Sequence, residues 1–221
     1  PNAGHAVHQT QEGAEALIAS IKEARARLPQ APEGRAFACT QVIGASQTGQ
    51  WYRDAPDFES VVDNDRWQLL ARGGGVIDLW SDPDYEGWAT PIFSPCLTGS
   101  ASPDQVVFTI SNPGVEREVA AWAGAIRAAV ATLRNKYPSV VQIVLQPVVG
   151  GPNHQLCPHP DRGVIRASSS HPVIDEAIGM VVGGDVVAGA SPEVSTCNDY
   201  SDGIGHLKLE AQGPVGRSIA L

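Results

Sequence analysis

Apolar side chains recur at every third or fourth position between residues 115 and 137, which predicts an amphipathic helix with one buried face. Pro138 ends this helix. Apolar runs at residues 105–110 and 140–145 flank it and are typical of strands buried on both faces. A strand, a helix and a strand at this spacing indicate a βαβ unit and a parallel sheet with helices on its faces. The apolar face of the predicted helix comprises Val119, Trp122, Ala123, Ile126, Val130 and Leu133.

The remaining pattern alternates helical and strand periods in the same way. Pro56 interrupts residues 51–66, which we expect to be helical only in parts. The predicted fold class is α/β, a three-layer α/β/α sandwich with a central, mostly parallel sheet. The 221 residues fit one domain, residues 1–221, without an internal repeat or a linker. Further elements are predicted as helices over residues 11–28 and 172–182, as strands over 35–43 and 186–190, and as a short strand that runs into a triple-glycine turn over 69–77.

Ser46 follows directly on the first predicted strand. The loop after such a strand lies at the crevice where open α/β sheets bind ligands. Gly44 and Gly49 flank this serine and let a substrate approach the backbone closely. Ser46 is therefore a candidate nucleophile. The alternative is a polar turn without a catalytic role.

Asp202 and His206 lie close together near the end of the sequence. A serine hydroxyl needs a base that accepts its proton, and the base needs an acid that holds its tautomer and stabilises its charge. His206 is the candidate base, and Asp202 is the candidate acid. Together with Ser46 they would form a catalytic set for acyl transfer.

The order and spacing of these blocks, from about Phe37 to His206, resemble the SGNH/GDSL hydrolases. In that family the nucleophile follows the first strand, and the acid and base share one loop near the C-terminus. The resemblance implies a flavodoxin-like SGNH fold and a serine esterase in which Ser46 attacks and Asp202 orients the base. The family spacing is D-x-x-H, whereas three residues separate acid and base here. Either the glycines between them accommodate the extra residue, or a backbone carbonyl orients the imidazole.

The same resemblance implies an oxyanion hole built from three separate blocks. The backbone N–H of Ser46 is one donor, and that of Gly75 in a triple-glycine turn is the second, with Gly74 as its neighbour. The third is the side-chain amide of Asn112. Residues 110–113 keep the Asn of the family's G-x-N-D block but lose its Gly and its Asp. The alternatives are a flexible glycine turn and an asparagine that only forms a turn before proline.

Tryptophans accompany the blocks that carry the nucleophile and the glycine turn. Aromatic faces beside a polar cleft suit the apolar face of a sugar ring, so we expect Trp51, Trp80 and Gly74 to contact substrate. The predicted substrate is a small-molecule or polysaccharide ester with a short acyl group, acetyl above all. The tryptophans could instead be core anchors, Trp80 in particular.

Two other functions remain open. An esterase or lipase of longer acyl chains is one, although the sequence has no long amphipathic lid pattern. A non-catalytic carbohydrate-binding relative is the other. The glycines after the first strand match no nucleotide-binding motif.

The formal net charge of −9 repels phosphate backbones, so we expect no nucleic-acid partner and no anionic membrane partner. No run of about 18 apolar residues is present to span a bilayer. The cysteines and histidines show no spacing that would hold zinc, so we predict no metal site and no cofactor. We also expect a monomer.

Cys157 and Cys197 bracket a late segment rich in Pro, Ser and Gly, just before the candidate acid. We predict a Cys157–Cys197 disulfide that holds this loop, with Cys39–Cys96 as a second pair. The alternative is four free thiols in a cytosolic protein. Disulfides favour a secreted or periplasmic enzyme. The sequence begins without a leader segment, so a signal peptide either has been removed or never existed.

Overall fold

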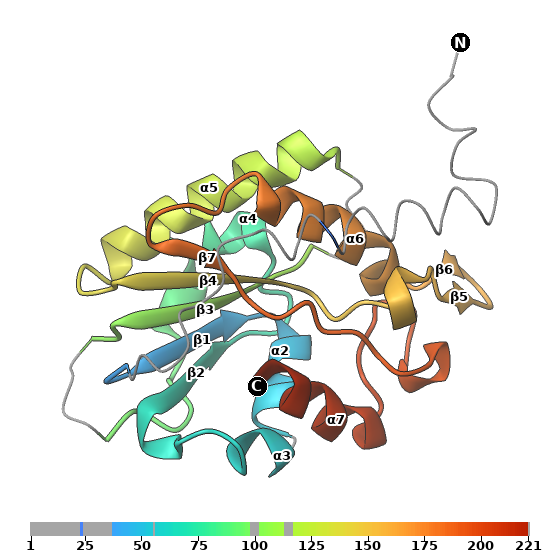
Figure 1. Cartoon of the computed structure of the whole chain (residues 1–221), viewed down its shortest axis with the longest axis horizontal. Helices are drawn as coiled ribbons and strands as arrows, with labels where there is room; N and C mark the ends of the chain where they lie inside the picture. The colour runs from blue at the N-terminus through green and yellow to red at the C-terminus, as the bar shows by residue number, and fades with distance from the viewer. Residues whose placement is uncertain (1–22, 24–36, 55, 98–101, 113–116, 221) are drawn as a thin grey trace.

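The computed structural model describes residues 23, 37–54, 56–97, 102–112 and 117–220. The helix predicted over residues 11–28 lies outside these residues, except for position 23. At the centre is a five-stranded sheet in the order β2-β1-β3-β4-β7, in which all neighbours run parallel (Figure 1). The predicted α/β class with a parallel central sheet is confirmed. The strands are β1 (Thr40–Gly44), β2 (Trp67–Ala71), β3 (Gln105–Ile110), β4 (Gln142–Pro147) and β7 (Val186–Ala188).

The inner strands are shielded from water on both sides. All residues of β1, β3 and β4 are buried, as the apolar runs at residues 105–110 and 140–145 predict for β3 and β4. The short strand predicted to start at residue 69 begins earlier, at Trp67, and ends at Ala71. The glycines beyond Ala71 form a turn, as the sequence predicts.

The strand order creates a crevice between β1 and β3. The chain passes from β1 to its neighbour β2 on one side and then crosses back to form β3 on the other side. The connections that leave β1 and β3 therefore diverge, and open α/β sheets bind ligands in the gap at the carboxyl ends of such strands. Ser46 follows β1 and Asn112 follows β3, so both candidate residues border this gap.

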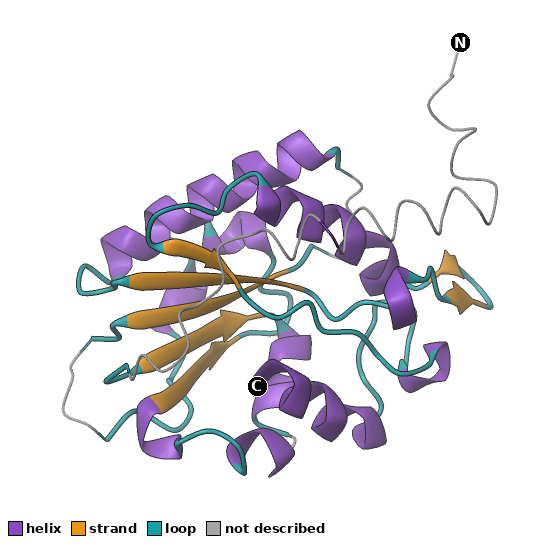
Figure 2. Ribbon diagram, in the orientation of Figure 1, coloured by secondary structure: helices purple, strands orange, loops and turns teal. Residues whose placement is uncertain are grey.

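Helices cover both faces of the sheet (Figures 1 and 2). On one face α5 packs against α4 and α6, and on the other face α2, α3 and α7 pack against one another. The helices are α2 (Ser46–Tyr52), α3 (Pro56–Glu59), α4 (Ile77–Trp80), α5 (Val119–Lys136), α6 (Arg166–Gly179) and α7 (Leu209–Ala220). Connecting segments form η2 (Asn64–Arg66), η3 (Glu86–Ala89), η4 (Pro152–His154), η5 (Cys197–Asp199), β5 (Pro158–His159) and β6 (Gly163–Val164).

Helix α5 confirms the strongest periodic pattern of the sequence, because its predicted apolar face is buried apart from the half-buried Val119. The other two long helices contain proline. The helix predicted to start at residue 172 begins at Arg166 and carries Pro172 in its interior. Helix α7 contains Pro214 and was not predicted. Proline removes a backbone donor and normally ends a helix, so packing against neighbouring helices outweighs that cost here.

Both predicted disulfides are present, Cys39–Cys96 and Cys157–Cys197. The first ties the residue before β1 to the connection between η3 and β3. The second ties the segment before α6 to η5, shortly before the candidate acid. None of the described helices combines the length and the apolar character that a bilayer crossing requires.

Candidate active site

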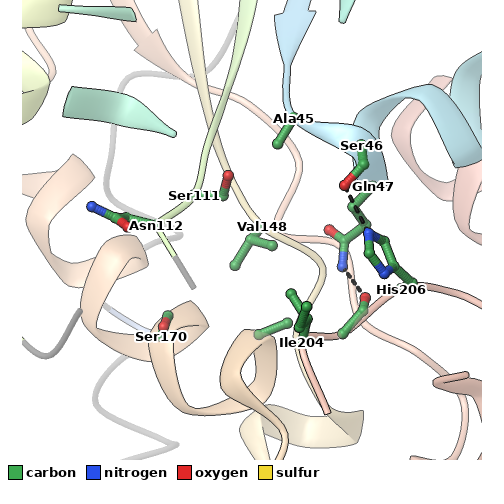
Figure 3. Close-up of a pocket in the computed structure, with 11 residues that line it drawn as sticks. Ala45, Ser46, Gln47, Ser111, Asn112, Val148, Ser170, Ile204 and His206 are labelled. Carbon is green, nitrogen blue, oxygen red and sulfur yellow. Dashed lines mark hydrogen bonds between the residues drawn. The ribbon is translucent and has the colours of Figure 1, made fainter. Parts of the chain in front are cut away.

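Two distant segments meet at the carboxyl end of β1. Ser46 is the first residue of α2, and Asp202 and His206 belong to the segment between η5 and α7. The Oγ atom of Ser46 lies 2.7 Å from Nε2 of His206 (Figure 3). On the other side of the same ring, Nδ1 lies 2.6 Å from Oδ2 of Asp202. The structure therefore places these three sequence-predicted residues in one hydrogen-bonded line.

The Asp202 carboxylate organises the loop that carries His206. Its Oδ1 accepts hydrogen bonds from the backbone N–H groups of Ile204, Gly205 and His206, at 2.9, 2.9 and 3.1 Å. Burial alone would raise the pKa of Asp202, but the hydrogen bonds from the His206 ring and from these N–H groups lower it to about 2. Asp202 is therefore ionised near neutral pH. The extra residue of the loop is accommodated in this turn, and the carboxylate contacts Nδ1.

Two glutamines of α2, neither of them among the sequence-predicted site residues, hold the same loop. Gln47 donates from Nε2 to the carbonyl of Gly205 at 2.6 Å. Gln50 accepts at Oε1 from the N–H of Leu207 at 2.9 Å. These contacts lie on either side of His206, so the helix that begins with the nucleophile also fixes the base. The signal in the sequence is two glutamines three positions apart, on one helical face, directly after Ser46.

Gly205 lets this loop pass close to α6. Its φ is +111°, in a region that side chains rarely adopt, and a Cβ there would lie 2.2 Å from Cβ of Ala167. A larger residue would push the loop away from α6 and displace His206.

Cavities open on two sides of Ser46 and His206. The narrow pocket has a cavity volume of about 30 Å³ and is mostly apolar (Figure 3). The wide cleft has a volume of about 410 Å³ and is largely polar. Besides Ser46 and His206, the narrow pocket is lined by Ala45, Gln47, Ser111, Asn112, Val148, Ala167, Ser170, Ile204 and Gly205. The wide cleft is lined by Gly49, Gln50, Arg53, Asp54, Ala71, Arg72, Gly73 and Ser201.

The glycine turn places Gly73 at the wide cleft. The N–H of Gly75 donates to the carbonyl of Arg72 at 2.9 Å, and its own carbonyl accepts from Nε1 of Trp80 at 2.9 Å. Gly74 is exposed at the tip of the turn, with a φ of +73°. The N–H that was predicted as an oxyanion donor is thus engaged inside the turn, because that turn closes between Arg72 and Gly75.

Asn112 is buried at the end of β3 and lines the narrow pocket. Its Nδ2 donates to Oδ2 of Asp78 at 2.7 Å, and Arg117 bonds to the same oxygen. Figure 3 shows the amide pointing away from Ser46. The predicted amide donor is therefore directed at Asp78 in this structure.

The two tryptophans predicted to contact substrate belong to the core. Trp51 is 0% exposed and packs against Tyr52 and Phe58. Trp80 is 1% exposed and packs edge-on against Trp88. Neither ring presents a face on which a sugar could stack, which agrees with the alternative interpretation as core anchors.

A group of possible metal ligands lies apart from this line. Among the described residues, His154, His171 and Glu193 bring ligand atoms within 4.8 Å of one another. The sequence prediction of no metal site did not anticipate this group, because its members come from three distant segments without a common spacing.

The structure is an open parallel sheet with helices on both faces, in which Ser46, His206 and Asp202 meet at the carboxyl end of β1. Two solved structures share this fold. A family 2 carbohydrate esterase from Cellvibrio japonicus superposes with a TM-score of 0.50 at 17% identity, over 87% of this chain and 61% of that chain. A candidate platelet activating factor from Streptococcus pneumoniae superposes with a TM-score of 0.51 at 12% identity, over 92% and 89% of the two chains.

These superpositions establish a shared fold. The chain spans 61% of the length of the carbohydrate esterase, so that protein contains a substantial part without a counterpart here. No protein-family profile matches the chain, and no curated protein sequence does either.

Proposed function

We propose that the protein is a serine esterase that removes short acyl groups, acetyl above all, from polar alcohols such as carbohydrates. The observation that carries this proposal is the hydrogen-bonded line from Ser46 through His206 to Asp202, with distances of 2.7 and 2.6 Å. A serine hydroxyl in this arrangement can pass its proton to the imidazole as it attacks a carbonyl carbon.

Each member of the line has one chemical task. Ser46 attacks the ester carbonyl while Nε2 of His206 takes the hydroxyl proton. His206 then gives this proton to the leaving alcohol, and the acyl group remains bonded to Ser46. A water molecule that is deprotonated by His206 attacks this acyl-enzyme and releases the acid. Asp202 accepts the hydrogen bond from Nδ1 and stabilises the imidazolium that forms.

We assign the oxyanion hole to the backbone N–H groups of Ser46 and Gly73, with the Asn112 amide as a third donor. Gly73 takes the place first given to Gly75, because Gly73 borders the wide cleft together with Ser46. Asn112 would contribute after its amide turns from Asp78 towards the narrow pocket that it lines. The loss of one such donor costs about 3 kcal/mol of transition-state stabilisation.

The size of the narrow pocket supports acetyl as the acyl group. About 10–15 Å³ of such space holds one water molecule. The 30 Å³ beside Ser46 therefore admits an acetyl group and little more. Small side chains such as Ala45 and Ala167 line this pocket, while Val148 and Ile204 limit its extent.

The wide cleft supports a polar alcohol as the leaving group. Arg53, Asp54, Arg72 and Ser201 offer hydrogen-bond donors and acceptors around a space of about 410 Å³. That combination suits a hydroxyl-rich ring better than a lipid. The carbohydrate esterase with the same fold is consistent with this substrate class.

Two disulfides support an oxidising compartment, so we propose that the enzyme is secreted or periplasmic. We further propose that it acts as a monomer with one domain and without a cofactor. Gel filtration of the purified chain tests the monomer.

A fluorophosphonate probe tests the nucleophile, because it reacts only with an activated serine. We expect labelling at Ser46, none in Ser46→Ala, and full labelling in Ser169→Ala, which removes an α6 serine that lines neither cavity. Ser46→Ala and His206→Ala should each abolish hydrolysis of p-nitrophenyl acetate, and Asp202→Ala should reduce it less. A folded parent protein that takes up no probe would contradict the esterase and favour a carbohydrate-binding protein.

Substrate competition tests the acyl and alcohol assignments. We expect p-nitrophenyl acetate to be hydrolysed faster than the octanoate, and acetate to be released from acetylated xylan or pectin. A preference for octanoate would favour a lipase over the acetyl esterase.

A further inference from the structure

A second cluster of polar side chains lies beside α6, away from the catalytic line. His154 comes from η4, His171 from the middle of α6, and Glu193 from the segment after β7. Nδ1 of His154 lies 3.4 Å from Nδ1 of His171 and 3.2 Å from Oε1 of Glu193. We propose that this cluster, the His154–His171–Glu193 site, binds one divalent transition-metal ion of the zinc class.

The donor atoms and their spacing match zinc. Zinc binds imidazole nitrogen and carboxylate oxygen at about 2.0–2.2 Å in a tetrahedron, which places two ligand atoms roughly 3.3 Å apart. The distances of 3.4 and 3.2 Å around His154 agree with that separation. Magnesium and calcium fit less well, because they prefer oxygen ligands alone. Three protein ligands leave the fourth position to a water molecule.

The ring of His171 is held in place from two sides. It is 0% exposed, and a Cβ on Gly150 would lie 2.4 Å from the ring, so the backbone at residue 150 packs directly on it. Its Nε2 lies 3.0 Å from Oγ of Ser191. A metal on Nδ1 leaves the proton on Nε2, which then donates to Ser191. Zinc-bound histidines commonly make such a contact, which fixes the tautomer and the ring orientation.

Glu193 fixes the other side of the site. Its carboxylate oxygens accept hydrogen bonds from the backbone N–H groups of Asn153 and His154, at 2.7 and 3.0 Å. These bonds hold η4 where both residues have left-handed backbone, with φ of 52° and 61°. Each carboxylate oxygen keeps a further lone pair that can bind a metal. These contacts position the Glu193 carboxylate for the ion.

A metal at this site would fasten one wall of the narrow pocket. Helix α6 carries Ala167 and Ser170, which line that pocket, and Val148 precedes the loop that packs on His171. The ion would join α6, η4 and the segment after β7, whereas the catalytic line contains none of its ligands. Because the site shares no residue with the catalytic line, the proposal stands independently of the proposed esterase activity.

Metal uptake by the purified full chain tests the proposal. Protein treated with a chelator is titrated with zinc chloride, and bound metal is counted by native mass spectrometry. We expect one zinc ion per chain and a rise in Tm of about 5–10 °C at a 100-fold excess over Kd. Cobalt(II) in place of zinc should give the visible absorption of a tetrahedral site.

Two ligand variants and two histidine controls separate this site from adventitious binding. His154→Asn removes the imidazole but keeps a residue that tolerates left-handed backbone, and Glu193→Gln keeps the side-chain shape. Each should weaken zinc binding at least about 100-fold, beyond most substitutions outside the ligand set. His159→Asn and His206→Ala should bind zinc as the parent does. No zinc retained by the parent, or equal affinity in the parent and His154→Asn, would overturn the proposal.

Discussion

Replacing Gln47 with alanine tests whether the helix that begins with the nucleophile also positions the base. The Gln47 side chain is 6% exposed and joins the carbonyl of Gly205, at 2.6 Å, to the N–H of Val149, at 2.8 Å. Alanine leaves both backbone groups without these bonds, and each buried polar group without a partner costs about 1–3 kcal/mol. Because Gly205 precedes His206, part of this cost is relieved by movement of the imidazole away from Ser46.

We therefore expect Gln47→Ala to lower kcat about 10- to 100-fold, which corresponds to about 1.4–2.7 kcal/mol of activation free energy. KM should change by less than about twofold, because the side chain acts on His206 rather than on the alcohol. The assay is steady-state hydrolysis of p-nitrophenyl acetate together with the rate of fluorophosphonate labelling at Ser46. Labelling reports the activation of the serine alone.

Two further glutamine variants serve as controls for this result. Gln155 is exposed, so Gln155→Ala should leave both rates unchanged. Gln50 is only partly buried and holds the N–H of Leu207, so Gln50→Ala should give a smaller decrease than Gln47→Ala. Urea unfolding separates stability from positioning. A loss of unfolding free energy in Gln47→Ala with an unchanged labelling rate would refute the positioning role and leave Asp202 as the group that holds the loop.

Three other perturbations test separate parts of the structure. The pKa of Asp202 is lowered from 3.8 to about 2, so its contribution to stability is present above about pH 4 and is lost as pH falls through 2. Between about pH 4 and pH 2, the free energy of unfolding should fall less steeply in Asp202→Asn than in the parent protein. Urea unfolding at a series of pH values measures this, and an equal pH dependence in both proteins would contradict the pairing of Asp202 with His206. Val148→Ala enlarges the narrow pocket and should raise the butyrate-to-acetate ratio of kcat/KM about tenfold. An unchanged butyrate-to-acetate ratio would show that the acyl group does not bind in the narrow pocket. Replacing Cys157 and Cys197 together with serine should lower the free energy of unfolding by about 2–4 kcal/mol and also lower kcat. Replacing Cys39 and Cys96 with serine should lower stability without lowering kcat. An equal loss of kcat in the two double variants would contradict the idea that the Cys157–Cys197 disulfide positions the loop of Asp202.

The fold could be predicted where one physical signal acted alone. Helix α5 has an unbroken apolar face, and the inner strands are continuous apolar runs, so periodicity was sufficient for both. Helices α6 and α7 contain Pro172 and Pro214, which oppose helix formation locally. The prediction therefore started α6 at Pro172 and missed its first turns, and it missed α7 entirely, whereas contacts with distant helices stabilise both.

The candidate site, like the fold, could be predicted only in part. Ser46 and His206 could be chosen because acyl transfer needs their chemistry at particular places along the chain. Three identical residues in a turn give no sign of which N–H faces a cleft, so the choice of Gly75 had no local basis. Trp51 illustrates a second limit, because the burial of a large aromatic side chain depends on neighbours such as Phe58 that the sequence does not place.

Helix α7 follows shortly after His206 and returns the chain to α2. At the contact, a Cβ on Gly216 would lie 2.6 Å from the carbonyl oxygen of Trp51, so the two helices meet backbone to backbone. Any larger residue at position 216 would act as a wedge between the helix that starts with Ser46 and the one that follows His206. The alignment of the Ser46 hydroxyl with the His206 ring thus depends on the absence of a side chain at Gly216, a residue that takes no part in the chemistry.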